Sequence, residues 1–106
     1  MDDALFHKRA DAALEDLFDA LNVAADDHGF EADFNTGALT IEFDDPPAKF
    51  VVSPNSPVSQ IWISANVRSY KLSWDEGAGV FSLEGRPLRQ VVAAAITEHL
   101  GESVHL

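Results

Sequence analysis

The sequence contains no cysteine, and this absence excludes several kinds of site. A chain without thiols forms no disulfide bond and offers neither a thiolate nucleophile nor a thiolate zinc site. It also provides no cysteine ligand with which to hold an iron-sulfur cluster of its own. Chemistry that requires a thiol of the protein is therefore excluded.

Basic residues are scarce as well. Seven lysines and arginines stand against eighteen aspartates and glutamates, which gives a formal charge of −11. This charge repels nucleic acid phosphates and anionic membrane surfaces, so we expect neither as a partner. Cations and basic protein surfaces suit it better. The net charge also fits a surface that only keeps the protein in solution, or the acidic proteome of a salt-loving source.

Long apolar runs are missing too, because proline, glycine or a charge interrupts each apolar stretch before about 18 residues. The first residues, MDDALFH, have neither the pattern of a signal peptide nor that of a transit peptide. We therefore expect a bacterial-type cytoplasmic protein, or a mature chain that has already been processed. Its 106 residues, 46% of them apolar, suit a single domain over residues 1–106.

Two segments have the spacing of helices that bury one face. Apolar residues recur every three or four positions between residues 2 and 25, and again between residues 87 and 100. This period predicts an amphipathic helix in each segment, because such residues share one side of a helix. Pro87 suits the first turn of the second helix, and Gly101 suits its end.

Short segments between these helices alternate apolar and polar residues, which is typical of half-buried strands. The predicted strands cover residues 30–34, 39–43, 49–53, 58–65, 68–74 and 80–83. Turn residues separate them, so consecutive strands should pair antiparallel, and residues 35–37 should close the first hairpin. Pro46 and Pro47 are expected in a turn, because proline cannot donate to a ladder.

The order of these elements predicts an α+β fold. A helix comes first, an antiparallel sheet of five to six strands follows, and a second helix closes the chain. Two helices with one apolar stripe each can cover only one face of such a sheet. We therefore expect a two-layer α-β sandwich with both helices on one sheet face and the other face open to water.

A family resemblance enters with one stretch of the sequence. Residues 37–43 read GALTIEF, and Pro57 precedes residues 60–64, which read QIWIS. This combination resembles the signature of the frataxin family, including its bacterial members, and the order of elements agrees. The resemblance implies the frataxin fold and a part in iron-sulfur cluster assembly, which in a chain without cysteine must be indirect.

Acidic residues gather on the exposed side of the first predicted helix and beyond its end. Those spaced four apart repel each other by roughly a few tenths of a kcal/mol per pair. Carboxylate oxygens suit hard cations such as ferrous iron, and an open ridge gives weak, exchangeable sites. The frataxin resemblance implies that this ridge binds iron, as Fe²⁺ or Fe³⁺. The expected acidic ridge consists of Asp11, Glu15, Asp19, Asp26, Asp27, Glu31 and Asp33.

Histidines add little to this prediction. His7 lies four residues before Asp11 and could supply a nitrogen ligand. His28 follows two aspartates and is either a ligand or, as is usual for a single loop histidine, simply solvated. His99 lies on the apolar stripe of the second helix, where we expect it to pack.

Trp62 is predicted to lie on the open sheet face. Ile61 and Ile63 share the face that meets the helices, so Trp62 and Gln60 point away from it. A large aromatic side chain there is either ordinary cross-strand packing or a contact with a partner. The resemblance implies docking on a cysteine desulfurase and an iron-sulfur scaffold protein. The expected partner-binding residues are Gln60, Trp62, Asn55 and Thr40, with Asn55 partly replacing an asparagine that the family usually has near Ser53.

No motif in the sequence predicts an enzyme, since it has neither a Gly-rich phosphate loop nor a nucleophile elbow. Ferroxidase activity, which has been proposed for frataxins, stays open as a weak secondary property. We expect an iron-binding regulator or adaptor of iron-sulfur cluster assembly, monomeric unless iron drives oligomerisation. The alternative is an acidic metal-buffering or iron-storage domain without a specific protein partner.

Overall fold

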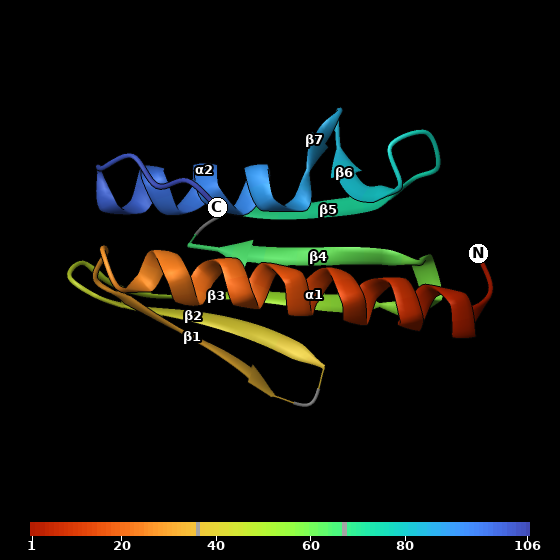
Figure 1. Cartoon of the computed structure of the whole chain (residues 1–106), viewed down its shortest axis with the longest axis horizontal. Helices are drawn as coiled ribbons and strands as arrows, with labels where there is room; N and C mark the ends of the chain where they lie inside the picture. The colour runs from red at the N-terminus through yellow and green to blue at the C-terminus, as the bar shows by residue number, and fades with distance from the viewer. Residues whose placement is uncertain (36, 67) are drawn as a thin grey trace.

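A seven-stranded sheet covered by two helices on one face forms the protein (Figure 1). This computed structural model describes residues 1–35, 37–66 and 68–106. The helices are α1 (Asp3–Ala25), the short 3-10 helix η1 (Ser56–Val58) and α2 (Leu88–Leu100). The strands are β1 (Phe30–Asn35), β2 (Ala38–Asp44), β3 (Pro47–Asn55), β4 (Gln60–Ala65), β5 (Arg68–Asp75), β6 (Val80–Leu83) and β7 (Arg86–Pro87).

All neighbouring strands pair antiparallel in chain order, so the predicted two-layer fold with both helices on one face is confirmed. The strand count is higher than the five to six predicted. The additional strand, β7, contains two residues, which are too few to show an alternating pattern in the sequence. None of the described helices is long and apolar enough to cross a membrane.

β1 and β2 pair antiparallel as predicted for the first hairpin, but Asn35, which was expected in the turn, is the last residue of β1. Asn35 lies opposite Ala38 at the end of the β1–β2 ladder, while Thr36 falls outside the described residues. The prediction for the next turn is wrong in part, because Pro47 already belongs to β3 and lies opposite Asp44. A proline can start a strand, since at this position the ladder does not require its missing N–H.

The start of β4 also differs from the prediction. The strand was expected from residue 58, but Ser56–Val58 forms η1 and Ser59 has a left-handed φ of 51°. Pro57 stands in the first turn of η1, where its fixed φ suits a helix. The chain is therefore not extended before Gln60, although its composition resembles that of a strand.

The buried stripe of α1 packs on the sheet with the stripe of α2. Asp2 caps α1, since its carboxylate accepts a hydrogen bond from the Leu5 N–H at 2.8 Å. Phe6 is fully buried and meets Phe81 of β6 edge to face, with ring centroids 5.9 Å apart. Both helices and the covered sheet face therefore share one apolar core.

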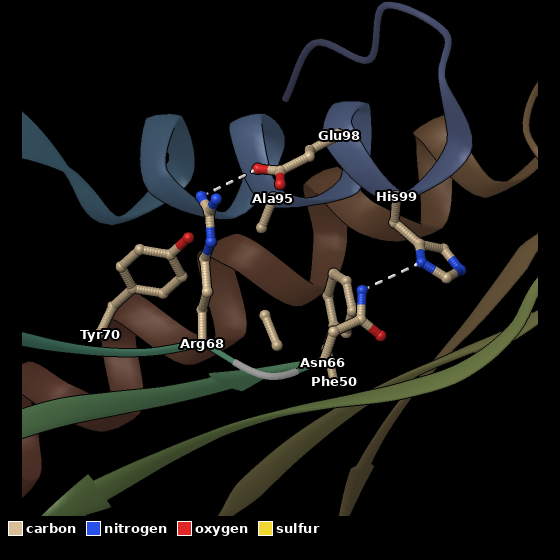
Figure 2. Close-up of a pocket in the computed structure, with 8 residues that line it drawn as sticks. Phe50, Asn66, Arg68, Tyr70, Ala95, Glu98 and His99 are labelled. Atoms are coloured by element: carbon tan, nitrogen blue, oxygen red, sulfur yellow. Dashed lines mark hydrogen bonds and ion pairs between the residues drawn. The ribbon is translucent and has the colours of Figure 1, made fainter.

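His99 of α2 contributes to packing, as predicted, and it also joins two turns to the helix. Its ring lies against Phe43 and Phe50, with centroids 4.6 Å and 5.7 Å away. Nε2 lies 2.8 Å from the Pro46 carbonyl, which can only accept, so Nε2 carries the proton. Nδ1 then accepts from the Asn66 amide at 3.1 Å (Figure 2). His99 thereby links the turn before β3 and the end of β4 to α2.

Polar contacts at the surface join α1 to α2 and to the C-terminal tail. Arg89 donates two hydrogen bonds to Asp16, at 2.7 Å and 2.9 Å, across the two helices. His28 bonds Glu102 at 3.0 Å and stacks beside Phe30, so the alternative of a solvated loop histidine is wrong. The bonds from Arg89 hold the pKa of Asp16 below its usual range.

The Asp16–Arg89 pair makes stability depend on pH. Because the folded-state pKa of Asp16 is depressed, its contribution is present above the unfolded pKa of about 3.9 and is lost as the pH falls through the folded value. Asp16→Asn should lower the free energy of unfolding at pH 7 by about 0.5 to 1 kcal/mol. The effect is no larger because both side chains of the pair are exposed and water screens their attraction. Urea titrations from pH 7 to acid should show the difference vanish.

Glu15→Gln is the matched control. Glu15 lies beside Asp16 on α1, and within the described part of the chain its carboxylate makes no ion pair. This change should not lower stability at any pH, since it relieves repulsion by Asp11 and Asp19. Equal pH profiles for Asp16→Asn and Glu15→Gln would contradict the assignment.

Candidate functional site

Trp62 stands on the sheet face that the helices leave open. The burial of β4 alternates, with Ile61, Ile63 and Ala65 in the core and Trp62 36% exposed. Its predicted direction is therefore confirmed. An exposed aromatic side chain on a rigid central strand is a strong anchor for a protein partner if it is already held in its bound orientation.

Gln60 holds the Trp62 ring in place. The indole Nε1–H donates to the Gln60 side-chain oxygen at 3.0 Å. The Gln60 amide nitrogen donates in turn to Ser73 Oγ on β5 at 3.2 Å. The oxygen and one N–H of this amide are therefore engaged inside the protein, so Gln60 fixes the tryptophan more than it offers itself to a partner.

Lys71 adds a positive charge beside the ring. It lies directly opposite Trp62 in the β4–β5 ladder, and its Nζ is 4.8 Å from the ring centroid. A cation over an indole face is attracted by the ring quadrupole. Sequence reasoning missed Lys71 and Ser73, although the alternation of β5 places both on the open face and the hairpin register places them beside β4.

The remaining predicted partner residues lie at unequal distances from the tryptophan. Asn55 of β3 is opposite Gln60, so it belongs to the same patch. Thr40 of β2 is opposite Val51, which is opposite Ser64, so Thr40 lies two strands away from β4. Trp62, Gln60, Lys71, Ser73 and Asn55 are called the tryptophan patch below.

The predicted acidic ridge separates into groups. Asp26, at the end of α1, lines a hollow of about 420 Å³ together with Glu31 and Asp33 of the edge strand β1. Asn22 also lines this hollow. Three of the predicted carboxylates are therefore brought together at the sheet edge, and they are called the edge acids below.

Asp19 and Asp27 line a different hollow, of about 560 Å³, between α1 and the C-terminal tail. Arg89, His28 and His105 share this hollow, so positive and titratable groups stand among the two carboxylates. Asp11 and Glu15 are exposed on α1, and His7 packs edge-on against Phe6. Among the residues described, no three histidine, aspartate or glutamate side chains are grouped closely enough to hold one metal ion.

Glu42 is an acid that sequence reasoning did not include. It lies directly opposite Glu31 in the β1–β2 ladder, on the open face, with Lys49 opposite it on the other side. Like charges directly opposite on a sheet destabilise it, and a cation bound there relieves the repulsion. The register of the first hairpin contained this signal, since a turn of two residues pairs positions 31 and 42.

The family model described as a frataxin-like domain matches residues 1–102 of this sequence. The chain belongs to the frataxin family. The resemblance found in the sequence is thereby confirmed. In this frataxin the helices pack on one face of the sheet, and the tryptophan patch lies on the other, open face.

Two relatives carry the name iron-sulfur cluster assembly protein CyaY. The protein of Tolumonas auensis is 27% identical over 108 residues, covering 100% of this chain and 99% of the relative. That of Pseudomonas aeruginosa is 29% identical over 108 residues, covering 98% and 95%. A solved structure of frataxin from Psychromonas ingrahamii matches with a TM-score of 0.73 and 20% identity, over 99% of this chain and 97% of that one, which confirms the fold.

The Glu31–Glu42 pair predicts a stabilising substitution in this frataxin. Glu31→Gln should raise the free energy of unfolding by about 0.2 to 1 kcal/mol, because it removes a like-charge pair across the sheet. The gain should shrink in high salt. Lys49→Gln, which removes the positive charge opposite Glu42, should act in the other direction. Urea titration at low and high salt measures both changes, and a loss of stability in Glu31→Gln would contradict the prediction.

Proposed function

We propose that this protein is an iron-binding adaptor of iron-sulfur cluster assembly that docks on a cysteine desulfurase and its scaffold protein through the tryptophan patch. Two relatives named for cluster assembly support the process. The absence of cysteine supports an indirect role, since the chain itself has no thiolate to hold a cluster. In the proposed role, the protein regulates cluster assembly and does not act as an enzyme.

The held, exposed indole of Trp62 is the observation that carries the docking half. A side chain that is already ordered loses little rotamer entropy on binding, so more of its burial energy remains for affinity. The bonds through Gln60 and Ser73 supply this order, and Lys71 sets a charge beside the ring. The patch thus combines an aromatic anchor with a cation, which suits a partner surface with an apolar pocket flanked by an acidic group.

Iron is proposed as cargo at the edge acids, weakly bound and in exchange with water. Asp26, Glu31 and Asp33 surround one open hollow, and Glu42 lies opposite Glu31. Hard oxygen ligands suit iron, and an open site leaves coordination positions for water or for a partner's ligands. Asp11 and Glu15 lie apart on α1, so they contribute long-range attraction to cations or to a basic partner surface.

The alternative of an iron-storage domain without a partner has less support. Storage requires sites that hold metal firmly, and the described residues include no group of three ligands placed around one ion. It also gives no purpose to a tryptophan that is held on an open face. Iron-driven oligomers in the absence of any partner would favour storage.

The docking half is tested by a reconstituted cluster assembly assay with purified desulfurase and scaffold protein. Trp62→Ala should weaken binding to the desulfurase by at least about tenfold, or 1.4 kcal/mol, and remove the effect of this protein on the assembly rate. Gln60→Ala should cause a smaller loss, because the indole remains but is less ordered. Val58→Ala, which trims another exposed apolar side chain, is the control. Wild-type affinity in Trp62→Ala would exclude docking through this face.

The iron half is tested by ferrous titration followed by amide NMR. Broadening should centre on residues 22–33 and on Glu42, and the triple variant Asp26→Asn, Glu31→Gln, Asp33→Asn should lose it. The double variant Asp11→Asn, Glu15→Gln is matched in kind and should keep it. Small uniform shifts over the whole chain would indicate only counter-ions around an acidic surface.

A further inference from the structure

A groove lies on the helix side of the molecule, at the other end of the strand order from the edge acids. It lies between the first half of α1, the β5–β6 hairpin and the start of α2, and its volume is about 450 Å³. That volume is within the range of small-molecule sites, about 300 to 1,000 Å³. This Trp74 groove is lined by, among others, Arg9, Ala13, Trp74, Gly79, Val80 and Arg89.

Small residues open the groove between bulky neighbours. Ala13 faces it from α1, and Gly79 from the turn before β6. Gly79 has a φ of +69°, and a Cβ built on it would lie more than 4 Å from any described atom outside its chain neighbours. The left-handed backbone favours glycine there, so this part of the wall is held open by the conformation of the turn.

Trp74 forms the floor and carries an unused donor. Its ring meets Phe81 edge to face at 5.1 Å, which fixes it in the core. Its indole Nε1 is buried, yet the described residues provide no hydrogen-bond partner for it. A buried donor without an acceptor costs about 1 to 3 kcal/mol, and a ligand that brought an acceptor within reach would remove that cost.

Two arginine side chains, Arg9 and Arg89, line the groove, although the protein is strongly acidic. Arg9 stacks over Trp74, with its guanidinium carbon 4.2 Å from the ring centroid. Among the residues described, its only ion pair is with Glu76 at 3.6 Å, which is long and involves a carboxylate that is 81% exposed, so Arg9 keeps most of its donors. Arg89, in contrast, is committed to Asp16. Each of these arginines therefore has a carboxylate partner, and Arg9, whose pair is the looser one, keeps more N–H donors for a ligand.

We infer that the Trp74 groove binds a small carboxylate with an aromatic or branched apolar body. The apolar body lies along Ala13, Val80 and the Trp74 ring, while the carboxylate takes the free donors of Arg9. An uncharged apolar ligand would leave that guanidinium unused, and a cation would be repelled by it. This inference does not depend on the proposed function, because the groove and the tryptophan patch are on opposite sheet faces.

Two probes of the same shape test the inference, 2-naphthoate and the neutral 2-naphthalenemethanol. The protein has two tryptophans, so a ¹H–¹⁵N spectrum shows two indole N–H signals, and Trp62→Phe assigns the one from Trp74. Naphthoate should shift the Trp74 indole signal and the amides of Ala13 and Val80. It should bind about tenfold more tightly than the alcohol, the equivalent of one charge-assisted contact.

Arg9→Gln should weaken naphthoate about five- to tenfold and leave the alcohol unchanged, whereas Arg68→Gln, at an exposed arginine on β5, should affect neither. Equal affinity for acid and alcohol would overturn the inference, as would an unmoved Trp74 indole signal at millimolar naphthoate. Shifts of the same signals that grow with protein concentration alone would assign the groove to a second copy of this chain and also overturn it.

Discussion

Burial of a single sheet face under two helices is the constraint on which the rest of this structure depends. Among the residues described, every buried side chain is apolar, and the buried side chains belong to one core. Since side chains alternate along a strand, each residue next to a core residue is forced outward. Trp62 between Ile61 and Ile63, and Glu31 after Phe30, are exposed for this reason. The core therefore produces the functional surface as its complement.

Charged side chains lie on the surface around this core. Repulsion among carboxylates on α1 and across the β1–β2 ladder lowers stability. The favourable free energy of burying the apolar core must be larger than this cost. Few cations are available to offset it, and those present have distinct places. Arg89 joins the helices, Lys49 stands opposite Glu42, and Lys71 stands over Trp62. With its few cationic side chains placed elsewhere, the protein leaves the negative charge of its edge acids without a neighbouring cationic side chain among the residues described. This arrangement suits exchangeable binding of a metal cation.

Much of this fold followed from periodicity. The helical stripes, five of the strand positions and the antiparallel pairing of the first hairpin match the structure closely. Errors occurred where proline changes the local geometry, since Pro47 begins β3 and Pro57 lies in η1. For the site, the direction of Trp62 was predictable from alternation in β4. The engagement of Gln60 by Ser73 was not, because it depends on how β4 and β5 align side by side.

The sequence by itself determined the order of layers, the buried stripes and the outward direction of Trp62, because each follows from a period of two or about 3.6 residues along continuous chain. Only the tertiary structure decided which acids meet. Asp26, Glu31 and Asp33 share a hollow, while Asp11 and Glu15 stay apart from it on α1. Such groupings join a helix end to a strand edge, and their distances depend on strand register and on the placement of helix against sheet, which a local pattern does not encode. The same reason applies to the Trp74 groove, whose walls come from α1, β5, β6 and α2.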